Sequence, residues 1–148
     1  MNVSDDPRPI QILLVEDSET DALLATEALN HSICNKLHLV TDGVEAMKFL
    51  HQQAPYQNAP RPDLILLDLN MPRKDGREVL AELKADESFK RIPVVVMTTS
   101  KDEYDVHCAY NNHANCYIVK PVDFEKFSDV VTTIKNFWFA VVTLPTES

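Results

Sequence analysis

The sequence predicts an α/β domain built on a parallel sheet with helices on both faces. Short apolar runs, typical of buried strands, alternate five times with segments of helical periodicity. Such alternation favours parallel strands joined by right-handed crossovers. The predicted strands are residues 10–15, 37–40, 64–67, 93–97 and 117–119.

Helices are predicted between these strands from the spacing of apolar residues. Ser18 is expected to cap the first helix, in which Ala22, Ala25 and Leu29 share one face, and Asp21 supports its first turn. The remaining helices are predicted over residues 44–51, 77–85 and 102–110 and from residue 123 onward. In the second helix, the residues expected to face the core are Val44, Met47 and Leu50.

Length and composition indicate one soluble globular domain. The chain has 148 residues, of which 45% are hydrophobic and 25% charged. We expect a flexible N-terminus over residues 1–9, the domain over 10–140 and a tail over 141–148. Residues 52–62 carry three prolines and no periodicity, which predicts a surface loop.

Charge and hydropathy exclude several classes of protein. The net charge of −9 argues against nucleic-acid binding, which needs clustered Lys and Arg. The start of the chain lacks the apolar core of a signal peptide, and the late apolar run 137–142 is too short to span a membrane. The three cysteines form no Cys-x-x-Cys pattern and are interpreted as reduced thiols, so we expect a cytoplasmic protein.

Glycine is scarce, and this limits how the chain could bind phosphate. Gly43 and Gly76 are the two glycines, too few for a Walker loop or a dinucleotide-binding fingerprint. A flavin-binding loop is disfavoured for the same reason. Any phosphate chemistry must therefore depend on carboxylates, a metal ion, a lysine or hydroxyl groups.

Polar side chains stand where the predicted strands end. Asp68 alone could simply end a strand and cap a turn. However, the carboxyl ends of parallel strands lie at one edge of the sheet, where open α/β sheets bind ligands. We therefore expect convergence of Glu16, Asp17, Asp68, Thr98 and Lys120.

This set of side chains suits phosphoryl transfer onto a carboxylate. Three carboxylates placed together repel one another unless a cation compensates, and hard oxygen ligands favour Mg²⁺. An Asp nucleophile beside Mg²⁺ and a Lys can accept a phosphoryl group, because metal and ammonium spread the charge that develops on the phosphoryl oxygens.

The chain resembles the receiver domain of two-component response regulators over nearly all of residues 10–138. The resemblance is carried by the acidic pair Glu16–Asp17, the DLNMPRKDG stretch with Asp68, the MTTS run with Thr98 and the IVKP run with Lys120. Within this family it is similar to the stand-alone response regulators of cyanobacterial phytochromes. That closer likeness rests on VEDS, the loop before Asp68, DGREVLAELK, RIPVVVMTTS and FWFAVVTLP.

The resemblance implies a flavodoxin-like sheet of order 2-1-3-4-5 and a histidine kinase that phosphorylates Asp68, and the closer likeness implies a kinase of the phytochrome type. It also implies a role for each site residue. Asp17 and Asp68 would bind Mg²⁺ by side chain, Asn70 by its backbone carbonyl and Glu16 through water; Thr98 and Lys120 would contact the phosphoryl oxygens; Tyr117 would be the switch aromatic; and the Lys120–Pro121 bond would be cis. Thr99 departs from the family, which usually has a smaller residue there, and its bulk could narrow access to Asp68.

The last predicted helix and the tail carry more apolar surface than one core-facing stripe can bury. These residues suggest a homodimer interface, and the alternative is a tail that folds back on its own domain. The interface residues are Phe127, Val130, Phe137, Phe139 and Val141.

Two other functions use the same architecture. An Asp-nucleophile phosphohydrolase would need a second Asp two residues after the nucleophile as general acid, and that position holds Asn70. A receiver-like adaptor that is never phosphorylated is disfavoured by the complete set of site residues. We therefore expect a signalling phosphoacceptor rather than an enzyme that acts on other substrates.

Overall fold

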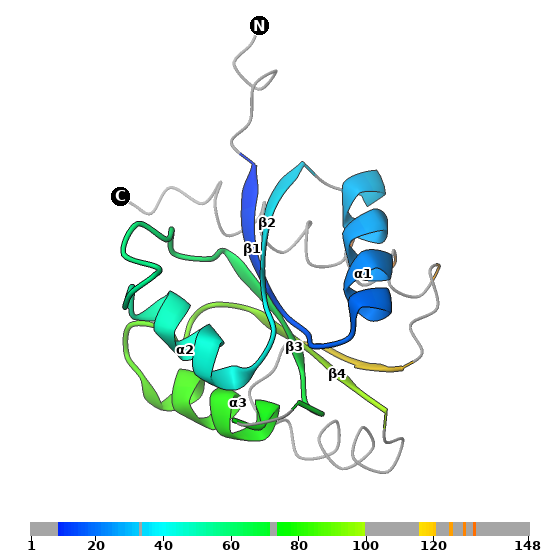
Figure 1. The fold of residues 1–148 in the computed structure, drawn as a ribbon. Coiled ribbons are helices and arrows are strands. Elements are labelled where there is room, and N and C mark those ends of the chain that lie inside the picture. Colours follow the sequence, from blue (N-terminus) through cyan, green and yellow to red (C-terminus); the bar gives the residue numbers. More distant parts are fainter. Residues whose placement is uncertain are drawn as a thin grey trace, which may run out of the picture.

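The parallel sheet predicted from the sequence is confirmed by the computed structural model. The structure describes residues 9–32, 34–71, 74–99 and 116–120, together with Glu125, Asp129 and Thr132. Its sheet has five strands in the order β2-β1-β3-β4-β5, and all neighbouring strands are parallel (Figure 1). The strands are β1 (Ile10–Val15), β2 (Asn35–Val40), β3 (Leu64–Asp68), β4 (Val94–Thr98) and β5 (Cys116–Val119).

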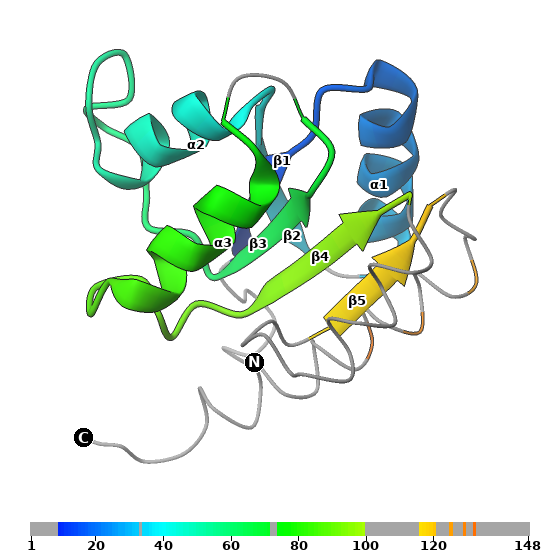
Figure 2. The same ribbon diagram turned by 90° about the horizontal axis from the view of Figure 1, so that it is seen from below.

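The described helices cover both faces of the sheet. α1 (Glu19–Ser32) lies on one face, while α2 (Gly43–Leu50) and α3 (Gly76–Ala85) lie side by side on the other (Figures 1 and 2). The predicted helix over 102–110 lies outside the described residues. Glu125, Asp129 and Thr132 are helical, in agreement with the helix predicted from residue 123. No helix in the described part of the chain is long and apolar enough to cross a membrane.

The central strands are buried on both faces, as their continuous apolar runs predict. Every residue of β3 and of β4 is buried. Alternate residues of β1 enter two separate cores: Leu13 and Val15 pack with α2 and α3, whereas Ile12 and Leu14 pack with α1. The sheet is therefore held rigidly between two apolar layers, with its strand ends at a fixed edge.

The predicted buried face is confirmed for α1 and is wrong in part for α2. Ala22, Ala25 and Leu29 are buried in α1, as expected. Leu50 is buried as expected, and Met47 is partly buried and packs against the core. Val44 stays partly exposed, and the buried residues of α2 include Phe49, which was not predicted to face the core.

The rotation of α2 follows from how its two ends are fixed. At its start, a Cβ on Gly43 would lie 2.3 Å from the Lys74 carbonyl oxygen, so the helix touches the segment before α3. Near its end, the Phe49 ring lies 5.3 Å from His38 and 5.5 Å from Tyr56. Burying the large Phe49 ring leaves Val44 at the edge of the core.

The proline-containing segment between α2 and β3 is a loop, as predicted. Residues 51–63 contain neither helix nor strand. The loop is tied to α2 because the Tyr56 hydroxyl donates a hydrogen bond to Glu45 Oε1 over 2.6 Å.

Some predictions concern parts of the chain that the structure does not describe. The expected boundaries at residues 10 and 140 stay predictions, because residues 1–8 and 133–148 lie outside the described part. The apolar residues expected at a dimer interface also lie outside it: Phe127, Val130, Phe137, Phe139 and Val141.

Candidate functional site

The carboxyl ends of four strands bring the predicted polar residues to one edge of the sheet. Glu16 directly follows β1, Asp68 ends β3, Thr98 ends β4 and Lys120 directly follows β5. The register aligns these ends, because Asp68 pairs with Met97 and the Lys120 amide donates to the Thr98 carbonyl over 2.7 Å. Residues far apart in the sequence thus meet as expected.

Three carboxylates form a compact acidic group at this edge. One oxygen each from Glu16, Asp17 and Asp68 lies within 4.8 Å of the others. Glu16 and Asp68 are buried, while Asp17 is exposed. Buried carboxylates so close together need a compensating cation, and a group with all-oxygen donors suits a hard divalent ion. These three residues could therefore hold such an ion, open to solvent on the Asp17 side.

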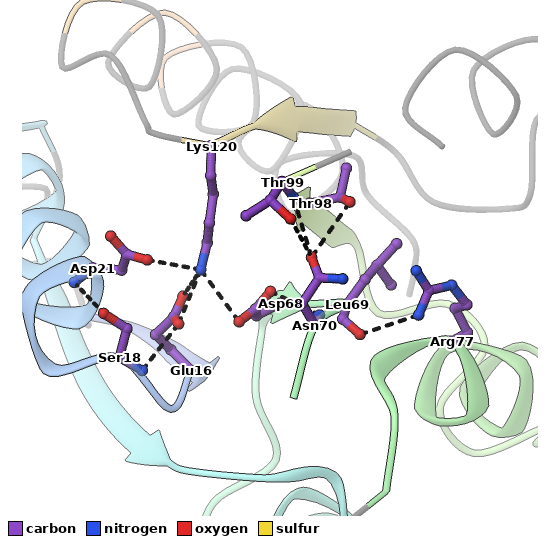
Figure 3. Close-up of polar contacts among 10 residues, drawn as sticks. All are labelled: Glu16, Ser18, Asp21, Asp68, Leu69, Asn70, Arg77, Thr98, Thr99 and Lys120. Atoms are coloured by element: carbon purple, nitrogen blue, oxygen red, sulfur yellow. Dashed lines mark hydrogen bonds and ion pairs between the residues drawn. The ribbon is translucent and has the colours of Figure 1, made fainter. Parts of the chain in front are cut away.

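The Lys120 ammonium already supplies one positive charge to this group. Its Nζ lies 2.8 Å from Glu16 Oε1, 2.9 Å from Asp21 Oδ2 and 3.2 Å from Asp68 Oδ2 (Figure 3). The Lys120 side chain is only 6% exposed. An ammonium has three N–H donors, so each of them can have a carboxylate oxygen as its acceptor here.

Burial and pairing act in opposite directions on the ionisation of this buried pair. Burial raises the pKa of Glu16 to about 7, against the hydrogen bond from Lys120, which lowers it. For Lys120, burial alone would lower the pKa, but hydrogen bonds to Glu16 and Asp21 and the charge of Asp68 raise it above its usual range. Lys120 is thus held as a permanent cation beside Asp68.

Asp21 is the site residue that sequence reasoning missed. It was predicted only to support the first turn of α1, whereas its carboxylate faces the site and accepts from Lys120. The Ser18 hydroxyl, in the predicted cap, accepts from the Asp21 amide over 3.2 Å. The available signal was the position of Asp21 in the first turn of a helix that begins beside a functional strand end.

Backbone contacts fix the Asp68 carboxylate. The Asn70 amide donates to Asp68 Oδ1 over 2.9 Å, which leaves Oδ2 facing Lys120. Behind Asp68, a Cβ placed on Gly76 would lie 2.3 Å from the Asp68 carbonyl oxygen, so the start of α3 touches the backbone of Asp68. The carboxylate therefore has one tethered oxygen and one oxygen directed at a cation.

Asn70 joins the end of β3 to the end of β4. Its Oδ1 accepts from the Thr99 amide over 3.1 Å and from the Thr99 hydroxyl over 3.3 Å, with a longer 3.5 Å contact from the Thr98 hydroxyl. Figure 3 shows both threonines beside the Asn70 side chain; Thr98 is fully buried and Thr99 is exposed. The backbone of Tyr117 pairs with Val96, but its side chain lies outside the described part, as does Pro121 with the predicted cis bond.

Comparison with known proteins assigns the family. Residues 12–132 match the sequence profile described as the response regulator receiver domain. The chain belongs to this receiver-domain family. The resemblance noted from the sequence, including the 2-1-3-4-5 sheet order, is thereby confirmed.

The receiver domain is similar to phytochrome response regulators. It is 52% identical over 145 residues to the response regulator Rcp1 of Synechocystis sp., and this alignment covers 97% of this chain and 99% of Rcp1. The structure of the phosphorylated cyanobacterial phytochrome response regulator RcpA matches with a TM-score of 0.77 and 49% identity, covering 94% of this chain and 100% of RcpA. The structure of the Mn²⁺-bound form of Rcp1 matches with a TM-score of 0.76 and 52% identity, covering 93% of this chain and 100% of the Rcp1 chain.

The site of this receiver domain thus combines a carboxylate with two groups that favour attack on phosphorus. Lys120 can compensate the charge of an incoming phosphoryl group, and the acidic group can bind a divalent ion beside Asp68. Receiver domains bind such ions, as the Mn²⁺-bound form of Rcp1 illustrates.

Proposed function

We propose that this receiver domain accepts a phosphoryl group on Asp68 from a histidine kinase, with Mg²⁺ as its cofactor. The observation that carries the proposal is the placement of Asp68, a buried carboxylate whose Oδ2 lies 3.2 Å from Lys120 Nζ at the centre of an acidic group. A buried nucleophile between a fixed cation and a candidate metal site suits phosphoryl transfer, which depends on positioning and charge compensation.

The residues of the site fit Mg²⁺. Asp17 and Asp68 would bind it by side chain, Asn70 by its backbone carbonyl and Glu16 through water, a set of hard oxygen donors. When bound, the ion neutralises charge on the phosphoryl oxygens. The Asn70 side chain is engaged with Thr98 and Thr99, which leaves its backbone carbonyl as the natural donor.

The transfer exchanges one bond to phosphorus for another. Asp68 Oδ2 attacks the phosphorus of a phosphohistidine on the kinase, and an O–P bond forms as the N–P bond breaks. The electron pair of that bond stays on the imidazole nitrogen, and the ring leaves neutral because its other nitrogen carries the proton. Lys120 and Thr98 would contact the phosphoryl oxygens, and no proton has to be removed from Asp68.

Phosphorylation would act as a switch between two conformations. The acyl phosphate carries about −1.5 to −2 charge in place of the single negative charge of the Asp68 carboxylate, and it brings strong acceptors next to Thr98. Thr98 would move towards a phosphoryl oxygen, Tyr117 would rotate into the space left behind, and the surface near 102–110 and 124–138 would change. The 3.5 Å contact from Thr98 to Asn70 is long for a hydrogen bond and is readily exchanged.

The partner is proposed from the relatives and from charge. RcpA is a phytochrome response regulator, so we propose a phytochrome-type histidine kinase as the phosphoryl donor, with both proteins in the cytoplasm. The net charge of −9 is unsuited to nucleic acid. A phosphotransfer assay against a phytochrome-type kinase and an unrelated kinase should show faster labelling by the former. Equal rates would contradict this choice of partner.

Homodimer formation through the last helix and the tail is also part of the proposal. It rests on the apolar residues of that segment, which lie outside the described part: Phe127, Val130, Phe137, Phe139 and Val141. We expect sedimentation to show a dimer at high concentration. Monomer alone, with and without phosphorylation, would contradict it.

A phosphohydrolase acting on other substrates is less well supported. The position two residues after Asp68 would have to deliver a proton, but it holds Asn70, whose Oδ1 is occupied as an acceptor for Thr98 and Thr99. Turnover of a simple phosphomonoester by the purified protein would favour the phosphohydrolase instead.

The proposal is tested by replacing the acceptor carboxylate. Asp68→Asn should abolish labelling by a small-molecule phosphodonor with Mg²⁺, because an amide oxygen cannot form the acyl phosphate. Asp75→Asn is a matched control that removes a nearby exposed carboxylate yet keeps a side chain able to cap α3. If Asp68→Asn takes up as much label as the wild type, the proposed function is wrong.

A further inference from the structure

We infer that Asp21 is a positioning residue that holds the Lys120 ammonium when Glu16 and Asp68 turn to a divalent ion. This inference deepens the proposed function and rests on it. It starts from the contact between Asp21 Oδ2 and Lys120 Nζ, which measures 2.9 Å and joins α1 to the residue after β5 (Figure 3).

The three carboxylates around Lys120 are not equivalent. Glu16 and Asp68 belong to the acidic group that could hold a metal ion, together with Asp17. Asp21 is outside that group, yet it contacts Lys120 as closely as Glu16 does. In the described structure, Lys120 therefore has two partners that metal binding would engage and one that it would leave in place.

Asp21 is held in place by the start of α1. The Ser18 hydroxyl accepts from the Asp21 amide over 3.2 Å, and the Ser18 amide donates to Glu16 Oε2 over 3.2 Å. The same turn is closed by a 2.9 Å hydrogen bond from the Ala22 amide to the Ser18 carbonyl. The backbone of Asp21 is thus anchored independently of Lys120, and the N-terminal end of a helix stabilises the negative charge of its side chain.

A buried ammonium is costly to leave without partners. Lys120 is 6% exposed, and a buried charge that loses its partners is strongly unfavourable. As Asp68 becomes a ligand and Glu16 contacts the ion through water, the negative charge of both is shared with the ion, and their attraction for Lys120 falls. Asp21 then keeps Lys120 charged and in place, with donors free for a phosphoryl oxygen. Without Asp21, Lys120 would compete for the same carboxylates as the metal.

The direct test is a double-mutant cycle on metal affinity, with Mn²⁺ alone as the probe and calorimetry as the measurement. We expect Asp21→Asn to weaken Mn²⁺ binding about tenfold, the loss typical of residues that orient a site's ligands. In a Lys120→Met background, the same substitution should change affinity less than about twofold, as for a peripheral charge. Equal losses in both backgrounds would overturn the inference, because Asp21 would then act only as an additional negative charge.

Two variants control the cycle. Glu19→Gln removes another acidic residue from the first turn of α1, which has no contact with Lys120 among the described interactions, and should leave Mn²⁺ affinity within about twofold of wild type. Asp21→Glu keeps the charge and should restore most of the affinity. A Glu19→Gln loss as large as that of Asp21→Asn would also overturn the inference.

A spectroscopic measurement avoids any variant of Lys120. In wild-type protein saturated with Mg²⁺, the Lys120 ammonium should give a slowly exchanging ¹H–¹⁵N signal, and this signal should be lost in Asp21→Asn under the same conditions. A signal that survives in Asp21→Asn overturns the inference.

Phosphorylation separates this inference from the proposed function. Asp21→Asn should slow labelling by a small-molecule phosphodonor about tenfold at saturating Mg²⁺. If the wild type takes no label but the cycle and the ammonium signal behave as expected, the proposed function fails and the role of Asp21 in holding Lys120 stands. If labelling of the wild type depends on Asp68, but Asp21→Asn has the same labelling rate and the same metal affinity as the wild type, the proposed function stands and the role of Asp21 fails.

Discussion

Gly76 lies directly behind the backbone of Asp68. A Cβ at this position would lie 2.3 Å from the Asp68 carbonyl oxygen and 2.6 Å from Leu69 Cα. Both atoms belong to the backbone, so neither can move aside as a flexible side chain would. The need for glycine here comes from close approach, since no glycine in the described part has a positive φ.

We predict that Gly76→Ala destabilises the fold and disturbs the site. Overpacking against backbone should lower the free energy of unfolding by about 1–3 kcal/mol, measured by urea denaturation. Labelling of Asp68 should also slow, because the Asp68 backbone has to shift.

Gly43→Ala separates these two effects. It meets the Lys74 carbonyl oxygen at 2.3 Å and should also destabilise the fold, but it does not touch Asp68. Labelling should therefore be slowed less by Gly43→Ala than by Gly76→Ala. Unchanged stability and labelling in Gly76→Ala would contradict the prediction.

At the residue scale, strand-end side chains could be predicted and helix-borne ones could not. Asp68 and Lys120 were predicted because a parallel sheet brings its carboxyl ends together whatever the sequence separation. Asp21 was missed because its direction depends on how α1 is rotated on the sheet, which the sequence alone leaves open. For Tyr117, the predicted switch role is a side-chain property outside the described part.

At the element scale, acidic caps fix where α2 and α3 begin. Asp42 caps α2 and accepts from the Glu45 amide over 2.9 Å, and Asp75 caps α3 and accepts from the Arg77 amide. Asp42 is buried, whereas the Asp75 side chain is 38% exposed. If the cap were lost, water could therefore hydrogen-bond to the freed amide at the start of α3 more easily than to the one at the start of α2.

We predict that Asp42→Ala lowers the free energy of unfolding by about 1–2 kcal/mol, the usual range for loss of a helix cap. Asp42→Asn should be close to wild type, because an amide oxygen can still accept from the Glu45 amide. Chemical denaturation with both variants checks this. An Asp42→Asn loss as large as that of Asp42→Ala would indicate that charge, rather than capping, is what Asp42 provides.

The edge strand β2 carries a histidine whose ionisation is coupled to folding. His38 Nε2 lies 2.8 Å from Gln11 Oε1, and its ring packs 5.3 Å from Phe49. Burial, with a smaller contribution from the charge of Lys36, lowers the pKa of His38. The unfolded chain therefore binds this proton more readily than the folded chain.

We predict that His38 makes the fold less stable as the pH falls through about 6.5, the ordinary value for histidine. The stability is fully present above that pH and is lost on acidification. Thermal unfolding across this window should show a steeper loss in wild type than in His38→Gln. Parallel pH profiles for the two proteins would contradict the prediction.

Helices and strands were predicted well where the pattern of apolar residues in the sequence allows one buried arrangement. The continuous apolar runs of β3 and β4 have no competing interpretation, and both strands are fully buried. The face of α2 was wrong in part because its apolar residues permit two stripes, and contacts of Phe49 with His38 and Tyr56 choose between them. Both ring partners of Phe49 lie outside α2, so the spacing of apolar residues within the helix could not show these contacts.

For the whole molecule, the acidic group links metal binding to stability. Burial raises the pKa of Glu16 because its negative charge is poorly solvated, and an ion bound near it would relieve that cost in the folded chain alone. The net charge of −9 adds a general attraction for cations.

We predict that Mg²⁺ stabilises the folded protein, by about 2.7 kcal/mol when its concentration is a hundred times the dissociation constant. Urea denaturation in MgCl₂, compared with NaCl of equal ionic strength, measures the part of this stabilisation that is specific to Mg²⁺. Asp17→Asn should remove most of the Mg²⁺-specific stabilisation, because Asp17 is the exposed member of the acidic group and provides a carboxylate on the side of the site that is open to solvent. An equal gain with NaCl would show that only screening is involved.

Glu16 and Lys120, which form the innermost ion pair, are 104 positions apart in the chain. A nascent polypeptide that has emerged only as far as β4 already carries Asp68 and the other carboxylates of the acidic group, but it still lacks the Lys120 ammonium. Under the proposed function, the complete phosphoryl-accepting site would therefore form only late in synthesis, when β5 docks. Completion of that site and completion of the sheet would then be the same event.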